Sequence, residues 1–113
     1  MKNILMTVGA AALMASAAHA EISDNVVKIG ILNDMSGPYS ALGGQGSLEA
    51  AKMAVEDFGG TVQGAPVEVV GADHQNKADI GATIARQWFD AEQVDTIMDL
   101  TTSSVALAVQ AIA

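Results

Sequence analysis

The sequence has no cysteine among its 113 residues. A disulfide framework is therefore excluded, and so is a lipid-bearing cysteine at a cleavage point. Basic side chains are scarce as well: five Lys and Arg stand against 13 Asp and Glu, which gives a formal net charge of -8. Because an acidic chain repels polyanions, neither nucleic acid nor an anionic membrane surface is an expected partner.

Long apolar runs are absent except near the start of the chain, between Lys2 and the small-residue pattern Ala18-His19-Ala20. A short basic start, an apolar run and a small-residue end are typical of a secretory signal peptide. We therefore expect residues 1–20 to be a cleaved signal peptide and residues 21–113 to be an exported domain. Acidic and polar residues follow the run, so we do not expect the protein to be embedded in a membrane.

The exported part alternates between two kinds of hydrophobic pattern. Short runs rich in β-branched residues predict strands at 26–32, 66–73 and 94–100. Spacings of three and four predict an amphipathic helix over 47–58, and a final helix begins after the third strand. The second predicted helix has Asn76 as its N-cap and an apolar stripe formed by Ile80, Ile84, Trp88 and Ala91, with Trp88 in the core.

This alternation predicts an α/β fold with a doubly wound parallel sheet. The commonest strand order places the first strand between the second and the third. The loops after the first and third strands, residues 33–46 and 100–104, then open onto one crevice at the carboxyl ends of the strands. We expect a ligand site there.

Four consecutive hydroxyl side chains, from Thr101 to Ser104, stand where the third strand gives way to its helix. The first turn of a helix exposes unpaired N–H groups and a partial positive charge, which suits an anion. One hydroxyl is explained by ordinary N-capping. The others indicate a site for a ligand carboxylate, with bonds from the amides and from Thr102 or Ser103.

Three stretches together carry a family resemblance: VKIGILNDMSGPYSALGGQGSLEAAKMAVEDFGG, VEVVGADHQNKADIGATIARQWF and VDTIMDLTTSSVALAV. They resemble the extracytoplasmic solute-binding proteins of ABC importers, in particular the Leu/Ile/Val-binding (branched-chain amino acid) family with its type I periplasmic-binding fold. The resemblance implies that residues 21–113 are the first part of the N-terminal lobe of a two-lobe protein. Such a protein is periplasmic and closes on its solute.

The resemblance also implies the ligand and the partner. The solute is a small carboxylate-bearing molecule, such as a branched-chain amino acid, an amide or an aromatic acid, and an inner-membrane ABC permease receives it. The carboxylate position falls on Thr102, with Ser103 beside it. Leu42 matches a cleft-lining position that is often aromatic in the family, and Tyr39 is expected to take part of that role. No cofactor, metal or catalytic step is implied.

The residues alone leave a second class of function open, that of a phospho-acceptor domain. Asp34, Asp73 and Asp99 all fall at or just beyond the carboxyl ends of predicted strands, where carboxylates hold Mg²⁺ in receiver-like phospho-acceptor domains. The export signal disfavours this alternative, and turn or cap roles explain the same residues. His74 is expected to be a surface-loop histidine without metal partners.

The last predicted helix has no stop signal before Ala113. Together with an unpaired sheet edge, this leads us to expect an N-terminal fragment that is marginally stable and binds no ligand alone.

Overall fold

The computed structural model describes residues 21–113, so the predicted signal peptide lies outside the described part of the chain. A short 3-10 helix precedes the sheet. The elements in chain order are η1 (Ser23–Asn25), β1 (Val27–Asn33), α1 (Gly44–Phe58), β2 (Thr61–Val62), β3 (Ala65–Asp73), α2 (Ala78–Asp90), β4 (Thr96–Met98) and α3 (Ser103–Gln110).

The four strands form one sheet in the order β2-β3-β1-β4. β1 runs parallel to both neighbours, with Ile29 opposite Val69 on one side and Thr96 on the other. The α/β class and the central place of the first predicted strand are thereby confirmed. The antiparallel β2 was not predicted; its two-residue turn, Gln63-Gly64, has positive φ at both positions (50° and 82°), as tight hairpins favour.

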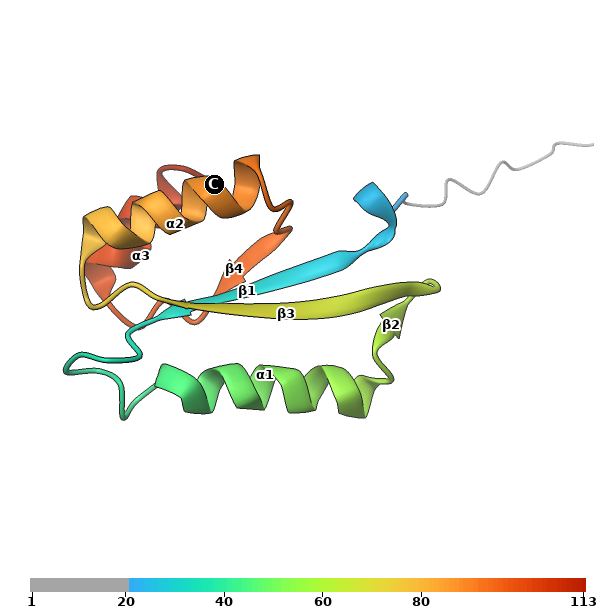
Figure 1. Ribbon diagram of the computed structural model, residues 1–113, viewed down its shortest axis with the longest axis horizontal. Coiled ribbons are helices and arrows are strands. Elements are labelled where there is room, and N and C mark those ends of the chain that lie inside the picture. Colours follow the sequence, from blue (N-terminus) through green and yellow to red (C-terminus); the bar gives the residue numbers. More distant parts are fainter. Residues whose placement is uncertain (1–20) are drawn as a thin grey trace, which may run out of the picture.

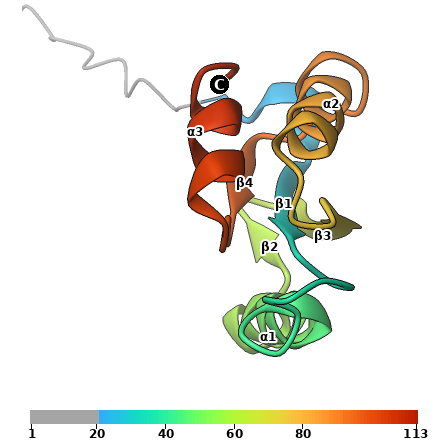
Figure 2. The same cartoon turned by 90° about the vertical axis from the view of Figure 1, so that its left-hand side faces the viewer.

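Helices cover both faces of the sheet, α1 on one and α2 with α3 on the other (Figures 1 and 2). The core lies on the α2–α3 side and consists of Leu32, Ala85, Trp88, Val94, Val105 and Val109. Trp88 is 5% exposed, which confirms its predicted core position. Gly30 makes room for it, because a Cβ at Gly30 would lie 2.6 Å from Cε3 of the indole.

The helix boundaries differ from those predicted. α1 begins at Gly44, three residues before Ser47, because the Ser47 N–H donates to the Gly43 carbonyl at 3.2 Å. Gly44 itself has a left-handed φ of 57°. Phe58 ends the expected apolar face of α1 but is 70% exposed. Ala91 lies beyond α2, where the chain leaves the helix, and it is exposed rather than part of the buried stripe.

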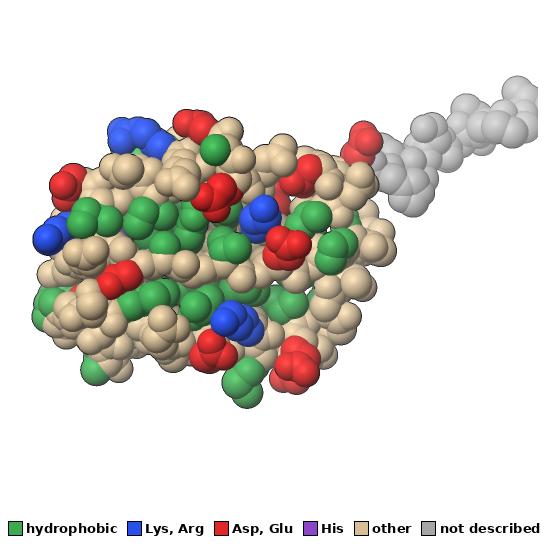
Figure 3. All heavy atoms as spheres, in the orientation of Figure 1, with side chains coloured by type: hydrophobic (Ala, Val, Ile, Leu, Met, Phe, Trp, Pro, Cys, Tyr) green, Lys and Arg blue, Asp and Glu red, His purple; other side chains and the backbone are tan. Residues whose placement is uncertain are grey.

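An open apolar groove of ≈ 660 Å³ runs along the α1 side of the sheet. Figure 3 shows rows of apolar side chains along the sheet between the helical layers. The groove lining includes Ile29, Ile31, Val55, Phe58 and Met98. Its lining is almost wholly apolar, so it does not provide the donors that a charged solute requires.

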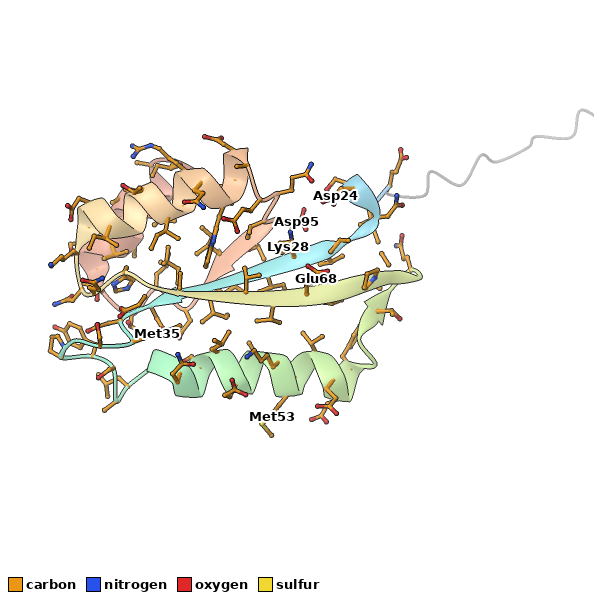
Figure 4. All side chains as sticks on the ribbon, viewed as in Figure 1. Asp24, Lys28, Met35, Met53, Glu68 and Asp95 are labelled. Carbon is orange, nitrogen blue, oxygen red and sulfur yellow. The ribbon has the colours of Figure 1, made fainter. Side chains whose placement is uncertain are left out.

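Polar bonds fix the amino ends of the strands. The Lys28 ammonium donates to the Glu92 carbonyl at 2.8 Å, and the Lys28 N–H donates to the Asp95 carboxylate at 2.7 Å. In Figure 4, Lys28 and Asp95 lie together at one end of β1, and Met35 lies at the other end. These bonds hold β4 beside β1, so the loops at the opposite, carboxyl edge start from fixed strands.

None of the helices within residues 21–113 combines the length and apolarity that a membrane crossing requires.

Candidate ligand-binding site

Three loops meet at the carboxyl edge of the sheet. Asn33, the last residue of β1, is fully buried, and its side-chain amide donates to the Asp99 carboxylate at 2.8 Å and to the Gly44 carbonyl at 3.2 Å. Gly43 packs against the loop after β4, because a Cβ there would lie 3.0 Å from Cγ2 of Thr101. The crevice loops expected after the first and third predicted strands are therefore neighbours.

The loop after β1 is folded around one carboxylate. Asp34 is fully buried and accepts the backbone N–H groups of Gly37 at 2.7 Å and Tyr39 at 2.9 Å. Glycine is required at position 37, since a Cβ there would lie 2.6 Å from the Asp34 carboxylate. The buried anion thus fixes the loop by charge-assisted bonds.

The two predicted cleft-lining side chains share one turn of this loop. The Leu42 N–H donates to the Tyr39 carbonyl at 2.9 Å. Their side chains stay open to solvent, 79% exposed for Leu42 and 40% for Tyr39. Leu42 directly precedes the glycine that packs on Thr101, so its backbone lies at the junction of the two loops.

The first turn of α3 has no side-chain cap. Thr102 occupies the N-cap position with extended backbone, yet its hydroxyl does not bond an amide of its own helix. The first helical bond runs from the Ala106 N–H to the Thr102 carbonyl, so the N–H groups of residues 103–105 precede it. Ser103 and Ser104 are exposed, which leaves this turn open to an anion from outside.

The hydroxyl of Thr102 is engaged elsewhere. It donates to the side-chain oxygen of Asn76 at 3.0 Å. Asn76 was predicted to cap α2, and that prediction is wrong. The N-cap of α2 is Lys77, and no side chain caps that helix. Asn76 instead links the loop after β3 to the start of α3.

His74 is fully buried, and its predicted surface position is therefore wrong. It directly follows β3 and lies next to Gly81 of α2. The side chain for which Gly81 makes room is that of Val105, because a Cβ on Gly81 would lie 2.5 Å from Cγ1 of Val105 but an ordinary 3.6 Å from the His74 Cβ. The Nδ1 atom accepts the Asn76 N–H at 3.0 Å, so the neutral ring carries its proton on Nε2. That N–H has no partner among the described residues.

The turn after β3 contains two side chains with shifted pKa values, His74 and Asp73. Burial lowers the pKa of His74 below its ordinary value of 6.5, although the nearby carboxylates of Asp34 and Asp73 oppose the shift. Asp73 behaves differently: burial raises its pKa, but bonds from Ser36 and from the amides of Met35 and Gln75 outweigh that effect and hold the pKa below 3.8. The turn therefore combines a neutral ring with an ionised carboxylate.

The three aspartates of the phospho-acceptor alternative do not form a cation site. Asp34 binds amides of its own loop, Asp73 accepts the Met35 and Gln75 N–H groups at 2.9 and 2.8 Å, and Asp99 accepts Asn33. Within residues 21–113, no three carboxylate, histidine or cysteine side chains converge as metal ligands do. The expected turn roles explain Asp34 and Asp73, whose carboxylates accept amides of the loops that follow them, whereas Asp99 links two loops through Asn33.

Comparison with known proteins gives the same class of fold. The model of the family described as "Periplasmic binding protein" matches residues 26–113. No curated protein gives a match. Among solved structures, a periplasmic binding protein from Burkholderia mallei is 55% identical, with a TM-score of 0.75, over 78% of this chain and 24% of its own.

Two further solved structures carry more specific names. A periplasmic ligand-binding protein of a branched-chain amino acid ABC transporter from Burkholderia xenovorans is 45% identical, with a TM-score of 0.73, over 76% of this chain and 23% of its own. A leucine-binding protein from Thermotoga maritima is 32% identical, with a TM-score of 0.67, over 76% of this chain and 24% of its own.

The chain thus spans about a quarter of the length of these relatives. The receiver-like alternative finds no support among them. On the family match over residues 26–113 and the identity to solved members, the chain belongs to the periplasmic binding protein family, which includes solute-binding proteins of ABC transporters.

Proposed function

We propose that the protein containing this chain is the substrate-binding component of an ABC importer and binds a small carboxylate-bearing solute at the start of α3. The observation that carries this proposal is the uncapped first turn of α3, which opens beside the loop after β1. Residues 21–113 would be part of the N-terminal lobe. The role is one of binding and delivery, not of catalysis.

The amides of this turn are suited to a carboxylate. Hydrogen bonds to a charged group contribute about 1.5 to 3 kcal/mol each, against about 0.3 to 1 kcal/mol from the helix dipole. The amides and the exposed Ser103 hydroxyl therefore supply most of the attraction. Because Thr102 directs its hydrogen to Asn76, its oxygen is left as an acceptor, which suits an ammonium group.

A carboxylate next to an ammonium acceptor favours an amino acid as the solute. Leu42 and Tyr39 add apolar surface at the edge of the same site. The branched-chain amino acid and leucine-binding relatives, 45% and 32% identical, support a branched-chain amino acid. We propose leucine, isoleucine or valine in preference to an aromatic acid or an amide.

Location and partner follow from the same family. We propose that residues 1–20 direct export and are removed, and that the protein works in the periplasm with an inner-membrane ABC permease. Cell fractionation of a strain that expresses the complete reading frame tests this location. The protein should appear in the periplasmic fraction without residues 1–20; recovery of the intact chain in the cytoplasm would contradict the proposal.

Calorimetry tests the ligand. The product of the complete reading frame should bind at least one of L-leucine, L-isoleucine and L-valine saturably, and benzoate and acetamide more weakly. Ligand that binds the folded state also raises the melting temperature. Absence of heat and of any melting shift with all five compounds at millimolar concentration would exclude the proposed class of solute.

A further inference from the structure

Asn76 contacts the N-cap residue of α3 across two loops. An N-cap threonine ordinarily turns its hydroxyl oxygen toward the N–H group two or three residues ahead, here that of Ser104 or Val105. Thr102 makes no such bond, and its hydroxyl donates to Asn76 at 3.0 Å instead. The side chain most able to cap α3 is thus held away from it.

Hydrogen bonds to Asp73 and His74 fix the backbone at Gln75 and Asn76. Gln75 and Asn76 both have left-handed φ angles, 54° and 56°. The Gln75 N–H donates to the Asp73 carboxylate at 2.8 Å, and the Asn76 N–H donates to Nδ1 of the buried His74 at 3.0 Å. A strained turn of this kind persists only where its surroundings determine it. The direction of the Asn76 side chain is set by these bonds.

We propose that Asn76 is a positioning residue of the ligand site: it holds the Thr102 hydroxyl off the first-turn amides of α3, so that these N–H groups remain free for the ligand carboxylate. The inference rests on the proposed function, because it assigns Asn76 a role in that same site. A capping hydroxyl and a ligand oxygen compete for the same N–H group. Loss of Asn76 lets Thr102 cap its own helix and closes part of the site.

The test uses N76G in the product of the complete reading frame. Glycine removes the side chain but accepts the left-handed backbone, whereas alanine would add strain. Q75G is the matched control, because Gln75 has nearly the same φ, and its exposed side chain makes no hydrogen bond in the structure. N76D keeps an acceptor for the Thr102 hydroxyl and serves as the conservative variant.

Amide hydrogen exchange tests positioning without any ligand. N76G should slow exchange at Ser104 or Val105 severalfold, because the Thr102 hydroxyl now bonds one of these amides. Q75G, N76D and the double variant N76G/T102V should exchange like the wild type, since none of them brings a hydroxyl to these amides. Unchanged exchange at both amides in N76G would overturn the proposal.

Calorimetric titration with L-leucine tests the consequence for binding. N76G should raise the Kd about tenfold, the size expected for one lost hydrogen bond. In the T102V background the same change should alter the Kd less than twofold, because no hydroxyl remains to cap. The role would be rejected if N76G and Q75G bound leucine equally well, or if N76G bound it more tightly than the wild type. It would also be rejected if N76G raised the Kd by the same factor in the T102V background as in the wild type.

The exchange and titration experiments test the role of Asn76 separately from the proposed function on which it rests. Absence of leucine binding in the wild type counts against the proposed solute, while the exchange arm still decides whether Asn76 keeps α3 uncapped. Slowed exchange in N76G with wild-type leucine affinity would overturn the positioning role and leave the proposed function intact.

Discussion

The imidazole of His74 accepts the backbone N–H of Asn76 at 3.0 Å while itself having no exposure to solvent. The same Asn76 accepts the hydroxyl of Thr102. A buried ring under the β3–α2 turn is thus connected, through one residue, to the start of the helix at the proposed site.

This arrangement predicts a loss of stability in mild acid. The pKa of folded His74 lies below 6.5, whereas the unfolded ring titrates near that value, so below pH 6.5 the unfolded state binds a proton that the folded state does not. Stability should be fully present above pH 6.5 and decrease as the pH falls toward 5. Urea denaturation at pH 8, 6 and 5 measures it. His74→Asn, which keeps an acceptor near Nδ1 but does not titrate, should flatten this decrease; the same decrease in the variant would assign it to other groups.

Thr102 should matter for affinity rather than for folding. Thr102→Val removes the hydroxyl at nearly constant volume, and we expect the Kd for L-leucine to rise about tenfold, as for the loss of one hydrogen bond. The melting temperature should fall by no more than a few degrees, because the hydroxyl caps nothing and makes one neutral hydrogen bond, to Asn76. Thr83→Val on exposed α2 surface is the matched control. Unchanged affinity in Thr102→Val would remove Thr102 from the site.

Leu42 tests whether the loop after β1 lines the cleft. The side chain is 79% exposed, so Leu42→Ala should leave the unfolding free energy within about 0.5 kcal/mol of the wild type. If a ligand covers it, affinity should fall by about 1 to 2 kcal/mol from lost apolar contact. Leu107→Ala, at a 69% exposed position on α3, is the control. Equal affinities in the two variants would contradict a cleft position for Leu42.

Asp34 should be necessary for the shape of that loop. Asp34→Asn places an N–H group where the Gly37 or Tyr39 amide now meets a carboxylate oxygen, at a cost of about 1 to 3 kcal/mol in stability. Urea denaturation measures this change, and faster amide exchange at Gly37 and Tyr39 should accompany it. The exposed Asp57→Asn on α1 should change neither quantity; a wild-type-like Asp34→Asn would show that the loop folds without the anion.

Gly30 provides a test of the packing of the sheet on α2. Gly30→Ala should destabilise the protein by about 1 to 3 kcal/mol, because the new methyl group meets the Trp88 ring within the core. Gly46→Ala on α1, where a Cβ meets nothing within 4 Å, should stabilise it by about 0.4 to 1 kcal/mol. Denaturant midpoints of the two variants should thus move in opposite directions. A Gly30→Ala variant as stable as the wild type or more so would mean that the sheet adjusts to the added methyl.

Local patterns in the sequence determined the architecture. Apolar runs and three-and-four spacings are short-range signals, so they placed β1, α1, β3, α2 and α3 within a few residues and put Trp88 in the core. The topological rule for parallel sheets then gave the order of the three parallel strands, with β1 between β3 and β4. The position of the hydroxyls at the start of α3 followed from the same elements.

Contacts between distant segments decided the rest. The close packing of α2 on α3 depends on Gly81, which leaves space for Val105, and the partner of Asn76 lies 26 residues away at the start of α3. Nothing in the local pattern HQN distinguishes a cap for α2 from a link to α3, because both use the same side-chain oxygen. The family and the place of the proposed site could therefore be predicted from the sequence. Which hydroxyl is engaged and which amides of α3 are left without a side-chain cap depends on how the loops pack together.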